Sequence, residues 1–312
     1  MLARLEHLAQ QLTATTTATM KAQQLPQWVS ELRQLVTRNL KENKDLVSYA
    51  LASKDIDSNQ PRVRYVVHRG FVNERRKDGD GSDNRVNDDD GNELISDKLV
   101  VTTDARRVRH DLAGRRLLPS LPADLESSRR SPKARQLATA PQIELAWWLA
   151  ATQHQFRIVG RAYILPSPSF SSHPPSASSS ASDPTLSSFS FPFLGAKLEP
   201  YEGFNWEHER VRQFRRMSPE LRASFYRPVP GTTLEKWGRK MEELPQTLPE
   251  SVEQAENDEQ KKQVEEAMKN FALIVIDATE VDLVDLGSMP NKRTRWLCDQ
   301  SSGEWKEEGL VP

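Results

Sequence analysis

The apolar stretches of this chain are short, and turns or polar insertions separate them; this spacing constrains the fold more than any other feature. Eight stretches have the length and residue types of β-strands. They span 47–53, 62–71, 98–103, 155–165, 271–277, 281–286 and 293–297, with a short last one at 305–310. Because regular helices do not alternate with these strands, a parallel βαβ sheet is disfavoured and a small antiparallel barrel is favoured.

Several other segments have helical patterns. The clearest is 27–41, where apolar residues recur at helical spacing and form one stripe. The stripe consists of Trp28, Leu32, Leu35, Val36 and Leu40. We also predict a helix at 105–113 capped by Asp104, an apolar helix at 141–151, a basic helix at 206–225 and a charged helix at 259–270.

Three polar insertions interrupt one predicted domain, which spans 25–312 and follows an N-terminal extension at 1–24. The first insertion, 73–97, is a polar loop with too few apolar residues in its charged, glycine-rich part to order itself. The second, 115–140, is also a polar loop. The third, 166–200, is rich in Ser and Pro and is predicted to be disordered.

The composition excludes several classes of protein. The formal net charge is −1, so the molecule lacks the overall field that nucleic acids or anionic membranes attract. Cys298 is the one cysteine, which rules out an internal disulfide and favours a reducing compartment. The six histidines lack ligand spacing, and no metal site is expected. With no membrane-length apolar run and no secretory signal pattern, we expect a soluble, cytoplasmic protein.

The end of the strand at 98–103 is the best candidate for an anion site. Asp104 as an N-cap leaves free backbone N–H groups at the start of the predicted helix, where the helix dipole also favours an anion. Arg106 and Arg109 share a face next to that end. Arg64 and Arg69 add cations from the neighbouring strand, although simple strand alternation puts these two on opposite faces. The residues alone leave open that these arginines are solvated or paired with carboxylates.

Three further features carry weaker signals. Gln155 begins a strand, where a side-chain amide can donate to and accept from the edge of a flavin or nucleotide ring. Trp147 and Trp148 are predicted anchors of the core. The basic run 210–227 indicates either a helix that binds nucleic acid or a partner, or a solvated basic face.

Motifs in the first half of the chain resemble those of pyridoxamine 5′-phosphate oxidases. The segment 64–69, Arg-Tyr-Val-Val-His-Arg, resembles the first FMN-binding strand of that family. Thr102-Thr103-Asp104 followed by Arg109 resembles the next motif, in which a Ser-Arg-Lys segment holds the FMN phosphate. The segment 155–160, Gln-Phe-Arg-Ile-Val-Gly, resembles the strand whose Gln contacts the flavin.

The end of the chain carries the resemblance further, since Arg295-Trp296 and the segment 305–312 resemble the closing motifs. The divergent, oxidase-like branch of the family fits best. It implies a mainly β (α+β) fold, a six-stranded antiparallel split β-barrel with flanking helices, and a homodimer with FMN between the subunits. The implied FMN site consists of Arg64, Tyr65, Val66, Val67, Arg69, Thr102, Thr103, Arg106, Arg109, Gln155 and Arg295. No residue stands out as a catalytic acid or base.

Departures from the family pattern point away from vitamin B6 oxidation. The authentic oxidase closes with Arg-x-His-x-Arg, whose first Arg and His engage the substrate; here Asn291 and Arg293 stand at those places. Arg107-Val108-Arg109 also replaces Ser-Arg-Lys. The expected function is an FMN-dependent oxidoreductase of unassigned substrate. The alternatives are a non-catalytic flavin-binding or sensing module, and a cofactor-free interaction protein that uses the basic helix 210–227.

Overall fold

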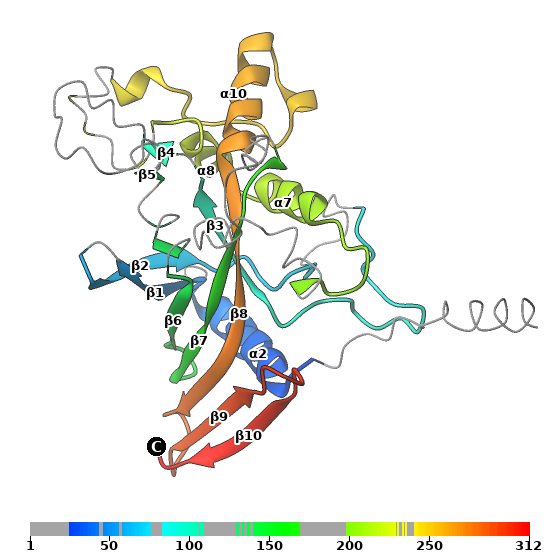
Figure 1. The fold of residues 1–312 in the computed structure, drawn as a ribbon, viewed down its shortest axis with the longest axis vertical. Helices are drawn as coiled ribbons and strands as arrows, with labels where there is room; N and C mark the ends of the chain where they lie inside the picture. The colour runs from blue at the N-terminus through cyan, green and yellow to red at the C-terminus, as the bar shows by residue number, and fades with distance from the viewer. Residues whose placement is uncertain are drawn as a thin grey trace, which may run out of the picture.

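The computed structural model shows a mainly antiparallel β protein with helices on its outside (Figure 1). It describes residues 25–43, 46–55, 58–75, 83–105, 107–108, 129–130, 133, 136–137, 140–168, 198–228, 230, 233, 235 and 240–312. The strands are β1 (Ser48–Asp55), β2 (Gln60–Val67), β3 (Leu99–Asp104), β4 (Arg107–Val108), β5 (Arg129–Arg130), β6 (Gln142–Leu149), β7 (His154–Leu165), β8 (Phe271–Asp285), β9 (Lys292–Cys298) and β10 (Trp305–Leu310). The helices are α2 (Gln27–Glu42), α7 (Trp206–Arg215), α8 (Pro219–Ser224) and α10 (Asp258–Asn270), with short 3₁₀ helices at η2 (Met241–Glu243) and η3 (Val252–Gln254).

Strand pairing builds the predicted barrel. The antiparallel sheet runs β10-β9-β8-β7-β6-β1-β2, and β3 pairs separately with β8. The chain just past β2 reaches β3, because the N–H of Arg69 donates to the Val100 carbonyl and the N–H of Val100 donates to the Gly70 carbonyl, each at 2.9 Å. The barrel therefore comprises β1, β2, β3, β8, β7 and β6, and it is held at this seam by a few hydrogen bonds rather than a ladder. The predicted antiparallel split barrel with flanking helices is confirmed.

The split lies along the fifteen-residue strand β8. β3 pairs with its first part, Phe271–Ile276, and β9 pairs with its second part, Glu280–Asp285. The sequence analysis predicted two strands here, whereas the structure has one. The register shifts where Val159 and Gly160 of β7 face Glu280 and Ala278, so Thr279 of β8 is an extra residue, and this bulge looked like a strand break in the sequence.

The apolar stripe of α2 packs into the main core of the barrel, as predicted. Trp28 and Leu32 are buried in one cluster with residues of every barrel strand, such as Leu51 on β1 and Phe156 on β7. Burying a side chain of this size contributes roughly 1.5–3 kcal/mol. The helix begins after Pro26, where the missing N–H of proline costs nothing.

The helices α7, α8 and α10 form a second layer against the other face of β8 (Figure 1). Side chains alternate along this strand, so Ile274 and Ile276 enter the barrel core while Leu273 and Val275 enter a second core under the helices. Phe271 extends this second core, with its ring 5.4 Å from that of Phe214. The first part of β8, residues 271–278, is therefore buried on both faces.

Three of the five arginines in the basic segment 206–225 are buried, namely Arg210, Arg212 and Arg222. The segment forms two helices, because Ser218 caps the second one and Pro219 occupies its first position. Arg212 and Glu209 form an ion pair at 2.6 Å in which neither side chain is exposed. Arg210 is 2% exposed and donates to backbone carbonyls of neighbouring elements. These two arginines hold the helical layer together and offer no surface to nucleic acid.

Two other predicted helices differ from the structure. The segment predicted as a helix at 141–151 is the strand β6, in which buried and exposed residues alternate, so Trp147 is buried and Trp148 is exposed. Within the helix predicted at 105–113, Arg107–Val108 is a short strand paired with Arg129–Arg130. The rest of that helix lies outside the described residues, as do the N-terminal extension and most of the insertions at 115–140 and 166–200.

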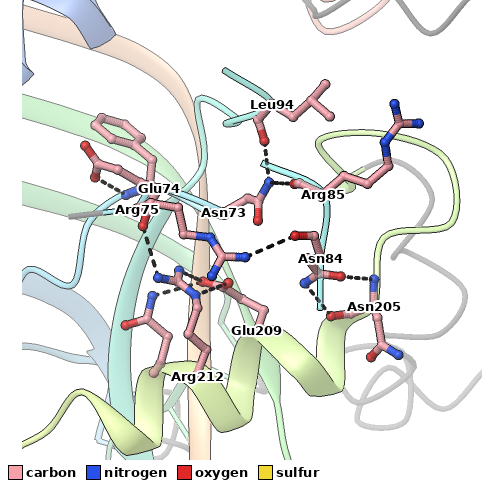
Figure 2. Close-up of polar contacts among 11 residues, drawn as sticks. Asn73, Glu74, Arg75, Asn84, Arg85, Leu94, Asn205, Glu209 and Arg212 are labelled. Atoms are coloured by element: carbon pink, nitrogen blue, oxygen red, sulfur yellow. Dashed lines mark hydrogen bonds and ion pairs between the residues drawn. The ribbon is translucent and has the colours of Figure 1, made fainter. Parts of the chain in front are cut away.

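The polar loop at 73–97 is tied to helix α7 by hydrogen bonds (Figure 2). The side-chain amide of Asn73 donates to the carbonyls of Arg85 and Leu94, each at 2.7 Å. Asn84 exchanges two hydrogen bonds of 3.0 Å with the backbone of Asn205. The described part of this loop is thus ordered by polar contacts to its neighbours, although it has few apolar residues of its own.

Candidate functional site

Arg64 lies at the centre of a polar cluster between β1 and β2. Its Nη1 donates to Ser53 Oγ at 2.6 Å, and its Nη2 donates to Gln136 Oε1 at 2.5 Å. Neither partner is charged. Burial, and then the charge of Arg62, lower the pKa of the Arg64 guanidinium. Arg62 differs from Arg64 because Asp55 lies 3.4 Å from its Nε and matches its charge.

Lys133 adds a second cation to this cluster. Its Nζ donates to the backbone carbonyl of Thr102 on β3 at 3.0 Å. Burial, followed by the positive charge of Arg64, lowers the Lys133 pKa to about 8, and the charge of Asp104 only partly opposes this. The surroundings of the Lys133 ammonium group therefore destabilise its charged form.

Lys98 provides a comparison, because this lysine forms ion pairs with carboxylates of the protein itself. Its Nζ lies 2.6 Å from an Asp97 oxygen and 3.0 Å from an Asp277 oxygen. Burial alone lowers the Lys98 pKa, but these two carboxylates raise it more, and the pKa is above its ordinary value. The contrast indicates that the Arg64–Lys133 cluster is built for an anion that the described part of the chain does not supply. A phosphate dianion satisfies both cations and accepts their hydrogen bonds.

The predicted ring-binding residues lie next to this cluster on β2. Tyr65 is 80% exposed on the outer face of the sheet, and Val66 is buried against Tyr49 in the core. One edge of β2 pairs with β1, and β2 ends the order of the sheet. The backbone of 65–67 thus has one edge without a strand partner among the described residues, as a ring held by backbone groups requires.

The remaining predicted residues are divided between two places. Thr102 contributes its carbonyl to Lys133, and Thr103 is buried beside it on β3. Arg69 joins β2 to β3 through its backbone. Gln155 and Arg295 lie on β7 and β9, at least three strands from Arg64 in the sheet order, so one chain does not bring them to the same cluster. Arg106 and Arg109 lie outside the described residues.

Sequence reasoning missed Lys133 and Gln136. The sequence Ser131-Pro132-Lys133 keeps the Ser and the Lys of the Ser-Arg-Lys segment that was sought directly after β3. In the sequence, the segment 105–130 separates this match from β3, and the residue predicted at this place was Arg109. Among the described residues, the side chain of Lys133 contacts β3.

Comparison with known proteins fits this arrangement. Residues 25–113 and 121–166 match the family described as "Pyridoxamine 5'-phosphate oxidase, FMN-binding domain". The chain has a pyridoxamine 5′-phosphate oxidase-type FMN-binding domain. FMN is the cofactor of this domain, and Arg64 and Lys133 fit its phosphate because, among the described residues, no carboxylate pairs with them as Asp97 and Asp277 pair with Lys98.

One solved structure shares the fold, and a second is more distantly similar. A pyridoxamine 5′-phosphate oxidase-related, FMN-binding protein from Nostoc punctiforme aligns with a TM-score of 0.52 at 19% identity, covering 93% of this chain and 99% of that one. PhzG from Burkholderia lata, in complex with tetrahydrophenazine-1-carboxylic acid, aligns with a TM-score of 0.45 at 12% identity, covering 90% of each chain. No curated protein matches the sequence significantly.

Two further classes of site were sought in the part of the chain that the structure describes. No described helix is long and apolar enough to cross a membrane. No group of three or more His, Cys, Asp or Glu side chains among these residues is arranged to hold a metal ion.

Proposed function

We propose that the protein is an FMN-dependent oxidoreductase that works as a homodimer in the cytoplasm. The observation that carries the proposal is the pair of cations, Arg64 and Lys133, gathered without a matching carboxylate pair beside the free edge of β2. Bound FMN supplies the electron-transfer chemistry. The contribution of the chain is to hold, orient and shield the flavin.

Each part of the cluster has a distinct task. Arg64 and Lys133 hold the phosphate, and Ser53 and Gln136 fix the guanidinium plane of Arg64 through two hydrogen bonds. The backbone of 65–67 faces the flavin ring. Ser53 and Arg64 come from β1 and β2, and Gln136 and Lys133 are hydrogen-bonded to Arg64 and to β3, so the packed barrel keeps the cofactor in one orientation.

A second copy of the chain completes the site in this proposal. Gln155, which the family resemblance places at the flavin, is separated from Arg64 by β1 and β6 within one chain. The outer face of β2 also carries large exposed apolar side chains, Val63 and Tyr65, above the small residues Ala50 and Ala52 of β1. An exposed apolar patch of this kind is typical of a protein–protein interface. Pairing of two such faces brings Gln155 of the partner subunit toward the flavin.

The test of flavin binding uses matched arginine variants. Purified wild-type protein is expected to be yellow and to release FMN that mass spectrometry identifies. Arg64→Ala is expected to lose most of the flavin. Arg62→Ala, which removes the same charge from the same strand but from a residue paired with Asp55, is expected to retain it. Colourless wild-type protein, or equal flavin content in the two variants, overturns the proposed site.

The test of dimerisation and activity uses the same preparations. Light scattering after gel filtration is expected to give twice the chain mass for wild type, and Tyr65→Glu is expected to give a flavin-depleted monomer. Reduction by NADPH and reoxidation by quinones or oxygen decide between an enzyme and a flavin-sensing module. A bound flavin that no donor reduces supports the sensing module instead.

A further inference from the structure

A row of side chains on the outer face of the sheet passes through Gln155. Trp148 on β6 and Val284 on β8 are its cross-strand partners, and Arg293 on β9 is the partner of Val284. Trp148 is 44% exposed, whereas its neighbour Trp147 is 2% exposed. An exposed indole next to an amide is a good surface for a planar ring, because aromatic faces stack with little loss of side-chain entropy.

The first two cations near this row are already bound to one carboxylate. Asp282 is only 5% exposed. It accepts a hydrogen bond from Arg157 Nη2 at 2.8 Å and another from Arg293 Nε at 3.0 Å. Taking either arginine away from Asp282 weakens the pairing of a buried charge, which is unfavourable.

The third cation is matched as well. Arg295 Nε donates to Glu308 Oε1 at 2.7 Å, and its Nη1 lies 4.0 Å from Glu280. The three arginines around Gln155 are thus balanced by three carboxylates. An anionic substrate gains little net attraction from this surface.

We infer that the substrate is an uncharged planar ring, of the quinone class, which stacks on Trp148 beside Gln155 and the flavin. This inference rests on the proposed function and adds the substrate class and a residue that determines specificity. Trp148 provides the stacking face, and Asp282 keeps Arg157 and Arg293 from recruiting phosphorylated or carboxylated competitors. Specificity thus has two sources: Trp148 attracts a planar ring, and Asp282 neutralises the arginines that would otherwise attract an anion.

The first experiment measures ligand binding to the FMN-loaded protein by calorimetry. The probes are duroquinone, which is uncharged, and pyridoxine 5′-phosphate, which has a ring of similar size and a phosphate. Duroquinone is expected to bind more tightly. Trp148→Ala is expected to weaken duroquinone binding about tenfold, equivalent to about 1.4 kcal/mol. Trp148→Phe, which keeps an aromatic face, is expected to restore most of it.

The second experiment reverses the charge balance with Asp282→Asn. Releasing Arg157 and Arg293 is expected to strengthen pyridoxine 5′-phosphate binding about tenfold and to leave duroquinone binding unchanged. If this variant does not fold, the Trp148 pair still decides the question. Tighter binding of pyridoxine 5′-phosphate by wild type, or an unchanged duroquinone affinity in Trp148→Ala, overturns the inference.

Different results would contradict the proposed FMN-dependent function and the proposed substrate class. Wild-type protein that binds no FMN overturns the proposed function itself. FMN-loaded protein that ignores the Trp148 substitution leaves the flavin site intact and removes only the substrate class. Flavin content is therefore measured for every variant before any ligand is added.

Discussion

Replacing Lys133 by Met is expected to stabilise the FMN-free protein while weakening FMN binding. Lys133 holds its ammonium in a partly buried place beside Arg64, and its pKa falls from 10.5 to about 8. The charge on this lysine therefore lowers the stability of the FMN-free protein at neutral pH. Methionine has similar length and no charge, so it removes the cost together with the phosphate contact.

The size of the effect follows from the pKa. A drop from 10.5 to about 8 is equivalent to about 3 kcal/mol of unfavourable interaction in the charged form. This cost is fully present below pH 8 and fades as the pH rises toward 10.5, because the folded protein loses the proton first. Loss of the hydrogen bond to Thr102 offsets about 1 kcal/mol. We expect a net gain of about 1–2 kcal/mol for the FMN-free protein at pH 7.

The same substitution removes a charged hydrogen bond to the phosphate. Such bonds are worth about 1.5–3 kcal/mol, so the FMN dissociation constant is expected to rise about 10- to 100-fold. Urea unfolding of the flavin-free protein and fluorescence titration with FMN measure the two effects separately. Lys133→Arg retains the charge and is expected to keep FMN affinity near that of wild type.

Lys98→Met is the matched control, because Lys98 is also a largely inaccessible lysine but has carboxylate partners. Asp97 and Asp277 then lose their cation, and we expect a loss of about 3–5 kcal/mol rather than a gain. If Lys133→Met raises the free energy of unfolding and Lys98→Met lowers it, Lys133 belongs to a site whose charge is balanced by a bound anion and not by the protein's own carboxylates. If Lys133→Met lowers the stability of the flavin-free protein and leaves FMN affinity intact, Lys133 is a structural residue and the reasoning is wrong.

Three further predictions concern pH, the barrel and the helical layer. FMN affinity is expected to be highest between about pH 6 and 8, because the phosphate gains a proton below this range and Lys133 of the free protein loses one above it. Fluorescence titration with FMN at a series of pH values should show the loss of affinity at alkaline pH in wild type but not in Lys133→Met. Gly160→Ala is expected to cost about 1–3 kcal/mol in urea unfolding, since a Cβ at this position would overlap the backbone carbonyl of Asp277, whereas Gly309→Ala, with open space around it, should be near neutral. Arg212→Met is expected to cost about 3–5 kcal/mol by leaving Glu209 buried and unpaired, and adding Glu209→Gln should recover part of this loss in the same assay.

The fold was predictable where local patterns were continuous. The stripe on α2 and the strands β1, β2, β3, β7 and β9 follow directly from residue periodicity and turn residues. β6 was predicted as a helix because Trp147 and Trp148 stand side by side and obscure the alternation. Ile143, Leu145, Trp147 and Leu149 are all buried, at intervals of two. Counting at period two across the whole segment identifies the strand.

The candidate site was predictable only in part. Arg64 and Thr102, which belong to the polar cluster, could be proposed from the sequence because each lies in an uninterrupted strand motif. Lys133 was missed because spatial neighbours separated by a long insertion leave no trace in local spacing. The burial of Arg210 and Arg212 was also hidden, since their partners, Glu209 and backbone carbonyls of β8 and α10, depend on tertiary packing.

The burial of the first part of β8 on both sides has a practical consequence for anyone who wishes to shorten this protein. The stretch recognisable by family likeness ends at residue 166, yet the strand that flanks both β3 and β7 begins at Phe271. A fragment that ends at residue 166 lacks β8, so the edges of β3 and β7 lose their strand partner and the apolar side chains packed against β8 become exposed. We expect such a fragment to aggregate. Fragments made for crystallisation or engineering should therefore retain the chain through its last strand, β10.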